Sequence, residues 1–147
     1  MLAEQWTIRK AMIDDLDYFL ESYNHIYGIQ YNKNTFLELF KKKLKSQASL
    51  MCVAVNTLNH AIGCIVCEKQ ETFQLLKPVL QIKEFFISPK YRKLHVADEL
   101  YIFVENIALK SGITKIEVMC NLTATTTQYF YLKKKFTLER KTYVKAI

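Results

Sequence analysis

The stretch IKEFFISPKYRKLHVADEL, Ile82–Leu100, carries the most information about the fold of this chain. Its first half is rich in apolar and aromatic residues, which predicts a strand that a proline then ends. Apolar side chains recur at helical spacing from Val96, so the basic turn before it opens a helix. A helix head exposes unpaired backbone N–H groups and the positive end of the dipole, a geometry that binds phosphate. Arg92 and Lys93 add positive charge, although such turns also occur without an anion.

Hydrophobic periodicity predicts strands and helices on both sides of this stretch. We expect strands at Gln5–Lys10, Leu50–Val55, Ala61–Lys69, Val79–Ser88, Ile113–Cys120 and Phe136–Val144. We expect helices after a cap at Asp14 and at Lys33–Lys45, Val96–Lys110 (with Gly112 just beyond its end) and Thr125–Lys134. The turn at 56–60 indicates an antiparallel hairpin, and Pro78 indicates a loop. The strand–helix–strand unit from 79 to 120 indicates a parallel pair, so a mixed α/β sheet with helices on both faces is predicted.

Composition points to a single domain over residues 1–147, because half of the residues are hydrophobic and no repeat or linker interrupts the chain. The formal net charge is +7 and the isoelectric point about 9.2. A basic balance favours anionic partners such as nucleic acid or a phosphorylated ligand. The lysines are scattered, however, so an ordinary solvated surface accounts for them equally well.

The four cysteines indicate neither a disulfide framework nor a metal site. Cys64 and Cys67 stand three residues apart in a predicted strand, which points their side chains to opposite faces. No second Cys or His pair follows at zinc spacing, so we expect reduced thiols and no metal. The N-terminus lacks an apolar signal core, and no apolar run approaches the ~20 residues that span a bilayer. We therefore expect a soluble, cytoplasmic protein without a membrane partner.

The order of these motifs resembles the GNAT superfamily of N-acetyltransferases. Their central motif is a strand, a proline, an aromatic residue and Q/R-x-x-G-x-G/A at the head of a helix. This chain has Pro89, Tyr91 and then RKLHVA, in which Arg92 and Ala97 match and His95 replaces the first glycine. The start, TIRKAMIDDLDYFLE, resembles the first strand and helix of the superfamily. The resemblance covers nearly the whole chain.

The end of the chain, TTTQYFYLKKKFTLER, resembles the closing motif A-x-x-x-Y-x-x-x-G-F of the same superfamily. Tyr131 falls five residues before Phe136, as the motif requires. Thr127 stands where alanine is usual, and Lys135 where glycine is usual. The resemblance implies a GNAT-like, mostly antiparallel sheet with one splayed parallel strand pair.

The resemblance also implies that acetyl-CoA binds as the co-substrate, without a metal. Backbone groups of Phe86 and Ile87 would pair with the pantetheine arm, and one N–H would polarise the thioester carbonyl. Asn121 would contact the cofactor or the substrate. The pyrophosphate would be held by the turn and helix head, namely Arg92, Lys93, Leu94, His95, Val96 and Ala97.

Two residues are the implied catalytic groups. Tyr131 would protonate the departing thiolate, because a phenol stays protonated at neutral pH. Glu84 would act as the base or anchor of the acceptor amine, although Lys83 precedes it where some relatives carry an acid. The amine would attack the thioester directly, through a tetrahedral intermediate and without a cysteine nucleophile.

Several alternatives stay open at this stage. A toxin-like relative would acetylate the amine of an aminoacyl-tRNA, and its tRNA affinity would fall steeply with salt. The departures at His95 and Lys135 also fit an inert domain that binds without turnover. An unrelated nucleic-acid-binding domain is disfavoured, because no aromatic RNP-type strand or helix-turn-helix pattern is present. The acceptor is equally open among aminoglycoside, polyamine, amino-acid and protein amines, as is a homodimer.

Overall fold

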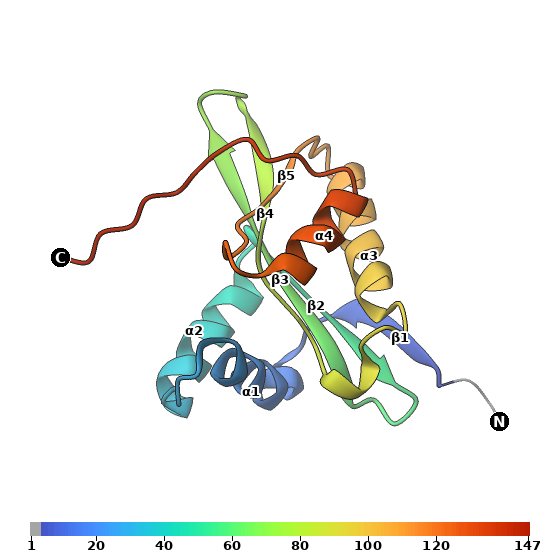
Figure 1. The fold of residues 1–147 in the computed structure, drawn as a ribbon. Coiled ribbons are helices and arrows are strands. Elements are labelled where there is room, and N and C mark those ends of the chain that lie inside the picture. Colours follow the sequence, from blue (N-terminus) through green and yellow to red (C-terminus); the bar gives the residue numbers. More distant parts are fainter. Residues whose placement is uncertain (1–3) are drawn as a thin grey trace.

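Residues 4–147, which the computed structural model describes, build one five-stranded sheet that helices cover on both faces (Figure 1). The strands are β1 (Trp6–Lys10), β2 (Ser49–Asn56), β3 (Ala61–Thr72), β4 (Lys77–Ile87) and β5 (Ile116–Val118). The helices are α1 (Leu16–Tyr27), α2 (Lys33–Lys45), α3 (Val96–Lys110) and α4 (Thr125–Lys133). The strands lie in chain order, antiparallel except for the parallel pair of β4 and β5. This is the mixed α/β sheet that the sequence predicts.

Each face of the sheet carries its own apolar cluster. On one face α3 and α4 pack over the sheet, and Leu100 of α3 is fully buried there. On the other face α1 and α2 meet through Phe19 and Phe40, whose ring centroids are 5.1 Å apart. Cys64 and Cys67 of β3 belong to different clusters, so their side chains point to opposite faces as the spacing predicts. The central strands are therefore buried on both sides.

A β-bulge in β4 decides which face its later residues reach. Ile82 lies opposite Cys67 of β3 and Glu84 lies opposite Val66, which leaves Lys83 without a partner in β3. Residues two apart in a strand normally share a face. The extra residue breaks that rule, so Ile82 packs on the α3 face while Glu84 points to the face of α1. The bulge thus sets the position of a predicted catalytic group.

The two parallel strands stay together for only three residue pairs. Leu80, Gln81 and Ile82 of β4 lie opposite residues 116–118 of β5. Beyond Ile82, β4 continues to Ile87 and pairs only with β3. Among the described residues, one side of this half of β4 therefore has no strand beside it.

The helices follow the predicted ranges closely, with one difference at the first. A turn of 3₁₀ helix at Ile13–Asp15 precedes α1, and Asp15 rather than Asp14 occupies the cap position. Both carboxylate oxygens of the buried Asp15 accept from the guanidinium of Arg9, at 2.8 and 2.9 Å. This pair between β1 and the 3₁₀ turn holds the start of the helix at Asp15, whereas the sequence pattern indicates Asp14. None of the helices between residues 4 and 147 is long and apolar enough to cross a membrane.

Three of the strand predictions need correction. Pro78 lies inside β4 rather than in a loop, because β5 pairs only from Leu80 onward and the missing N–H of the proline breaks no bond to it. β5 is shorter than predicted, since it pairs with β4 at three positions only. The predicted strand Phe136–Val144 is wrong, because no strand forms after α4. That segment touches β5 through side chains, without a backbone ladder among the described residues.

Candidate active site

The turn between β4 and α3 presents a row of unpaired backbone donors. Pro89–Tyr91 forms a short 3₁₀ turn, and the first ladder bond of α3 runs from Glu99 N–H to the His95 carbonyl at 3.1 Å. The N–H groups from Lys93 to Asp98 have no acceptor in the part of the chain that the structure describes. Consecutive free amides at the positive end of a helix dipole attract an anion. The free amides therefore make this turn a candidate anion site.

The backbone at this turn adopts a conformation that favours glycine. His95 has φ +69° and Lys93 has φ +63°, both in the left-handed region. For a residue with a Cβ this conformation costs roughly 1–2 kcal/mol. The His95 side chain is 83% exposed, and its Nδ1 lies 3.1 Å from the Asp98 carboxylate. The imidazole thus points to solvent. The backbone at His95 keeps the left-handed conformation that a glycine would favour.

Positive side chains surround the free amides. Arg92 donates from Nε to the Ile87 carbonyl at 3.0 Å, and its guanidinium lies 5.6 Å from the centre of the Phe86 ring. Lys134, just after α4, contacts the Asp98 carboxylate at 2.6 Å. This bond, together with the weaker effect of His95, lowers the pKa of Asp98. The negative charge of Asp98, in the first turn of α3, is therefore already paired with a protein cation.

The open side of β4 offers free backbone groups at alternate residues. Ser88 N–H donates to the Ile62 carbonyl of β3 at 2.9 Å. Because antiparallel strands alternate between paired and unpaired residues, Phe86 directs its backbone groups to β3. Those of Phe85 and Ile87 then face the open side, which agrees with the Ile87 carbonyl accepting from Arg92. The expected open-side position therefore fits Ile87 but not Phe86, whose backbone groups point to β3.

Tyr131 lies in the buried cluster between α4 and the sheet. Its side chain is 4% exposed and packs edge-on against Phe130 and Phe136, at centroid distances of 5.3 and 5.2 Å. Its hydroxyl makes no hydrogen bond among residues 4–147, and its oxygen keeps some contact with solvent. Burial raises the pKa of Tyr131, and the nearby Cys120 adds to this shift. The phenol is therefore a protonated donor without a protein acceptor.

Glu84 lies on the opposite face, against the end of α1. The Tyr27 hydroxyl donates to its carboxylate, and the Tyr27 ring stacks on Tyr23 at 6.0 Å. Burial raises the pKa of Glu84, while the hydrogen bond from Tyr27 and the charge of Lys83 oppose that rise. The carboxylate is half-buried and has an aromatic wall beside it. Sequence reasoning did not find this contact, because nothing local links two residues 57 positions apart.

Asn121 is exposed and shapes the turn that leads into α4. Its side-chain oxygen accepts from the N–H and the hydroxyl of Thr123, at 3.3 and 3.2 Å. Gln128 of α4 donates to the Asn121 carbonyl at 2.9 Å. The side chain is thus engaged locally, close to the end of β5.

The divergence of β4 and β5 lies between the two predicted catalytic groups. A small hollow is lined there by Gln81, Ile82, Lys83, Glu117, Val118 and Met119. Tyr131 belongs to the α3 face and Glu84 to the α1 face, so they approach β4 from opposite sides. A wider hollow of about 540 Å³ lies at the β1–β2 edge and contains none of the predicted site residues. The β4–β5 divergence is therefore the candidate site because the predicted site residues surround it, although its hollow is smaller than the one beside β1 and β2.

Comparison with known proteins decides the family. The sequence model of the acetyltransferase (GNAT) family matches residues 16–136. The chain belongs to this family. The acetyltransferase finds no match among curated protein sequences, so solved structures provide the remaining comparisons.

Solved structures share the fold of this acetyltransferase at low sequence identity. Aminoglycoside 6'-N-acetyltransferase AAC(6')-Ih from Acinetobacter baumannii has a TM-score of 0.82 at 18% identity, covering 97% of this chain and 99% of that one. A transcriptional regulator from Bacillus halodurans has a TM-score of 0.88 at 16% identity, covering 97% and 100%. AAC(6')-Iy in complex with a bisubstrate analogue of CoA has a TM-score of 0.84 at 16% identity, covering 97% and 99%.

At two positions where the family motifs have glycine, this acetyltransferase has another residue with the same backbone conformation. Both His95 and Lys135 have positive φ, at +69° and +71°. The chain therefore keeps the left-handed conformation at each position and accepts the strain of a side chain there.

Three of the four cysteines of the acetyltransferase are buried in the core. Cys52, Cys64 and Cys67 are buried and free. Burial raises the pKa of the Cys52 and Cys64 thiols to about 12, so both are uncharged at neutral pH. Between residues 4 and 147 no three His, Cys, Asp or Glu side chains are grouped to hold a metal ion.

Proposed function

We propose that this chain transfers an acetyl group from acetyl-CoA to the amine of a small molecule. The observation that carries the proposal is the row of unpaired N–H groups from Lys93 to Asp98, next to the open side of β4. A diphosphate on the first feature and an amide-containing arm along the second would satisfy both sets of donors. Acetyl-CoA contains these two groups in one molecule.

The backbone supplies most of the cofactor contacts in this proposal. The N–H groups from Lys93 to Ala97 hold the pyrophosphate, and Arg92 adds charge beside them. The free groups of Phe85 and Ile87 pair with the pantetheine arm, while Phe86 stays bound to β3 and presents its ring to α1. One of the free N–H groups polarises the thioester carbonyl as it becomes an oxyanion.

Tyr131 serves as the acid in this mechanism. The hydroxyl of this largely buried side chain keeps its proton at neutral pH and has no hydrogen-bond acceptor among residues 4–147, so it is available to the departing sulfur. Donation to that sulfur stabilises the thiolate of CoA as the carbon–sulfur bond breaks.

Glu84 receives the acceptor amine and takes its proton, directly or through water. A raised pKa suits this role, because a stronger base removes a proton more readily at neutral pH. The neutral amine then attacks the thioester carbon, and the tetrahedral intermediate collapses to the acetylated amine and CoA. Positioning and the preset N–H donor supply most of the rate, without a covalent enzyme intermediate.

A small-molecule amine is the favoured acceptor class. Two of the structural relatives named above, AAC(6')-Ih and AAC(6')-Iy, are aminoglycoside N-acetyltransferases. Glu84 supplies one half-buried carboxylate for an ammonium group, and Tyr23 and Tyr27 supply aromatic surface beside it. This combination fits one cationic amine with an organic body next to it.

The test has two stages. Binding is measured first by the thermal shift with acetyl-CoA. Release of the CoA thiol is then followed with a panel of aminoglycosides, polyamines and amino acids. Thiol release with a small amine supports the proposal. Binding without release on any amine supports an inert domain, and tRNA binding that falls steeply with salt supports the aminoacyl-tRNA alternative.

A further inference from the structure

The head of α3 carries two acidic side chains close to its unpaired N–H groups. Asp98 and Glu99 lie in the first turn of the helix, where the dipole favours negative charge. An acid at the third helical position can also reach back and accept from the N–H of the N-cap residue. In α3 the N-cap residue is His95 and the third position is Asp98. Both acids are therefore in a position to compete with a diphosphate for the free amides.

Neither carboxylate accepts from a backbone N–H in the part of the chain that the structure describes. Glu99 accepts from the indole N–H of Trp6 in β1, at 2.6 Å. Asp98 lies 2.6 Å from the Lys134 ammonium and 3.1 Å from Nδ1 of the exposed His95. Partners in β1 and just after α4 thus hold the two acids away from the amides.

Lys134 is fixed where it meets Asp98. Its side chain is 22% exposed, and its ammonium lies over the rings of Tyr101 and Phe130, at 5.7 and 5.5 Å from their centres. Two aromatic faces and a carboxylate therefore share one cation. The contact with Lys134 is the main cause that lowers the pKa of Asp98. The carboxylate is thus charged at neutral pH, and without its cation it would repel a diphosphate nearby.

We propose that Lys134 is a positioning residue of the acetyl-CoA site. It holds Asp98 off the free amides at the head of α3 and cancels its charge, so that a diphosphate can bind there. The inference rests on the proposed function, and it assigns Lys134 an effect through Asp98 rather than a direct contact with phosphate. Without Lys134, Asp98 turns back to the N–H of His95 and closes the site with its own negative charge.

A double-mutant cycle tests this role. Calorimetry measures the dissociation constant of acetyl-CoA for the wild type, Lys134→Met, Asp98→Asn and the double variant. We expect Lys134→Met to bind roughly tenfold more weakly, because an uncompensated charge then faces the diphosphate. Asp98→Asn should bind at least as tightly as the wild type. The double variant should return to within about twofold of Asp98→Asn, since Lys134 then has no charge to cancel. Lys134→Arg keeps the cation and should restore most of the affinity.

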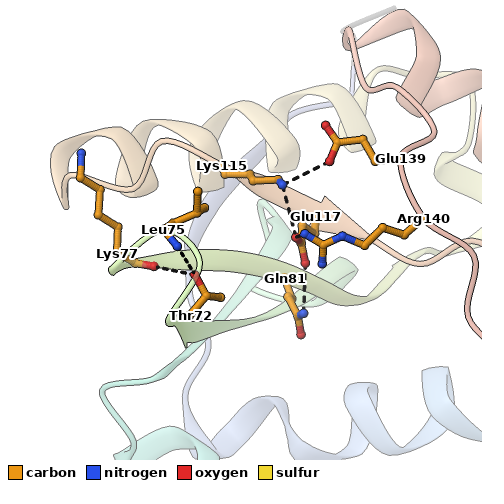
Figure 2. Close-up of polar contacts among 8 residues, drawn as sticks. All are labelled: Thr72, Leu75, Lys77, Gln81, Lys115, Glu117, Glu139 and Arg140. Carbon is orange, nitrogen blue, oxygen red and sulfur yellow. Dashed lines mark hydrogen bonds and ion pairs between the residues drawn. The ribbon is translucent and has the colours of Figure 1, made fainter.

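Two control variants separate this effect from a general loss of positive charge. Lys115→Met breaks an ion pair beyond the opposite end of α3, where a lysine that is 29% exposed lies between Glu117 and Glu139 (Figure 2). Lys133→Met removes the charge of the residue before Lys134, whose ammonium lies 4.9 Å from the centre of the Tyr129 ring. Both variants should bind acetyl-CoA as the wild type does.

Three results would overturn the inference while leaving acetyl-CoA binding, and so the proposed function, intact. The first is a Lys134→Met variant that binds like the wild type. The second is an equal loss from Lys134→Met in the Asp98→Asn background, because Lys134 would then contact the phosphate itself. The third is weaker binding by Asp98→Asn alone, because the intact ion pair would then be what binding requires.

Two further outcomes are also decisive. A wild type that does not bind acetyl-CoA would overturn the proposed function and this inference together. Circular dichroism checks that each variant is folded. Should Lys134→Met fail to fold, Asp98→Asn still decides, because its affinity must not fall below that of the wild type.

Discussion

At the residue scale, the site combines a strained backbone with side chains that work by position. Two residues stand in left-handed conformations where the family has glycine, and both lie beside predicted functional groups. His95 begins α3 next to the free amides, and Lys135 follows α4 next to the Tyr131 region. The physical cost at each position is local, because it arises from the Cβ and the preceding backbone.

His95→Gly should relieve this strain. The gain of roughly 1–2 kcal/mol is partly offset by the ~0.5–1 kcal/mol that a flexible glycine costs in the unfolded chain. We expect a net rise in unfolding free energy of about 0.5–1 kcal/mol, and tighter binding of acetyl-CoA. Urea denaturation and calorimetry measure the two effects. His95→Ala is the matched control, because it keeps the Cβ, and an equal gain there would remove strain as the cause.

Tyr131→Phe should remove the proposed acid and little else. The hydroxyl makes no hydrogen bond within residues 4–147, so we expect its loss to leave packing and cofactor affinity nearly unchanged. We expect kcat to fall about 100-fold, the lower end of the range for a general acid. Steady-state kinetics with the identified amine, together with calorimetry on acetyl-CoA, make the measurement. Tyr129→Phe on the exposed side of α4 is the control, and equal kcat in Tyr131→Phe and wild type would exclude Tyr131 from the mechanism.

Protonation of Glu84 should lower kcat/KM on the acidic side of its pH profile, which we call the acidic limb. Its carboxylate must be charged to accept a proton, so kcat/KM falls as pH drops through its raised pKa. The Tyr27 hydrogen bond stabilises the charged form. Tyr27→Phe therefore raises the pKa further and moves the limb to higher pH. Tyr23→Phe keeps that bond and should leave the limb in place, so a limb unmoved in Tyr27→Phe argues against Glu84 as the base.

At the scale of elements, the bulge in β4 determines which side chains of this strand face α3 and which face α1. Without the extra residue, the strand on one side of Lys83 would turn its side chains to the wrong face. Leu80 and Ile82, both buried on the α3 face, would exchange places with neighbours such as the polar Gln81, or Glu84 would leave the side of α1. The bulge thus couples core packing to the position of the carboxylate.

Deleting Lys83 should therefore destabilise the protein strongly. Misplacing two buried aliphatic side chains costs at least about 3 kcal/mol, from ~1.5–3 kcal/mol for each. Lys83→Ala keeps the residue count and the bulge, so we expect its unfolding free energy to stay within about 0.5 kcal/mol of wild type. Urea denaturation compares the three proteins. Equal stability of the deletion and the alanine variant would mean that the register adjusts without the bulge.

At the scale of the whole molecule, the proposed function predicts stabilisation by ligand. Acetyl-CoA at 100 times its dissociation constant should add about 2.7 kcal/mol to the folded state. For a domain of this size that raises Tm by roughly 5–10 °C. S-acetylpantetheine lacks the diphosphate, so at equal concentration it should give a much smaller shift. Equal shifts for both ligands would show that the head of α3 does not hold the diphosphate.

The sequence by itself determined the features that depend on neighbours along the chain. The bounds of α2 and α3 follow from apolar side chains at helical spacing, and each helix agrees with its predicted range. The basic turn before α3 is likewise local, because free amides belong to any helix head. The antiparallel pairing of β2 with β3 also follows, since the short turn at 56–60 joins them, and the crossover through α3 predicts the parallel pair of β4 and β5.

Only the tertiary structure decided where strand residues point and which strands form. The face of Glu84 depends on its register with β3, and its partner Tyr27 comes from a distant helix. The segment 136–144 has a strand-like sequence but remains unpaired within one chain. A helix completes its hydrogen bonds within its own segment, whereas a strand needs a partner from elsewhere. For that reason sequence fixes the helices here, and long-range contact fixes the strands and the site between them.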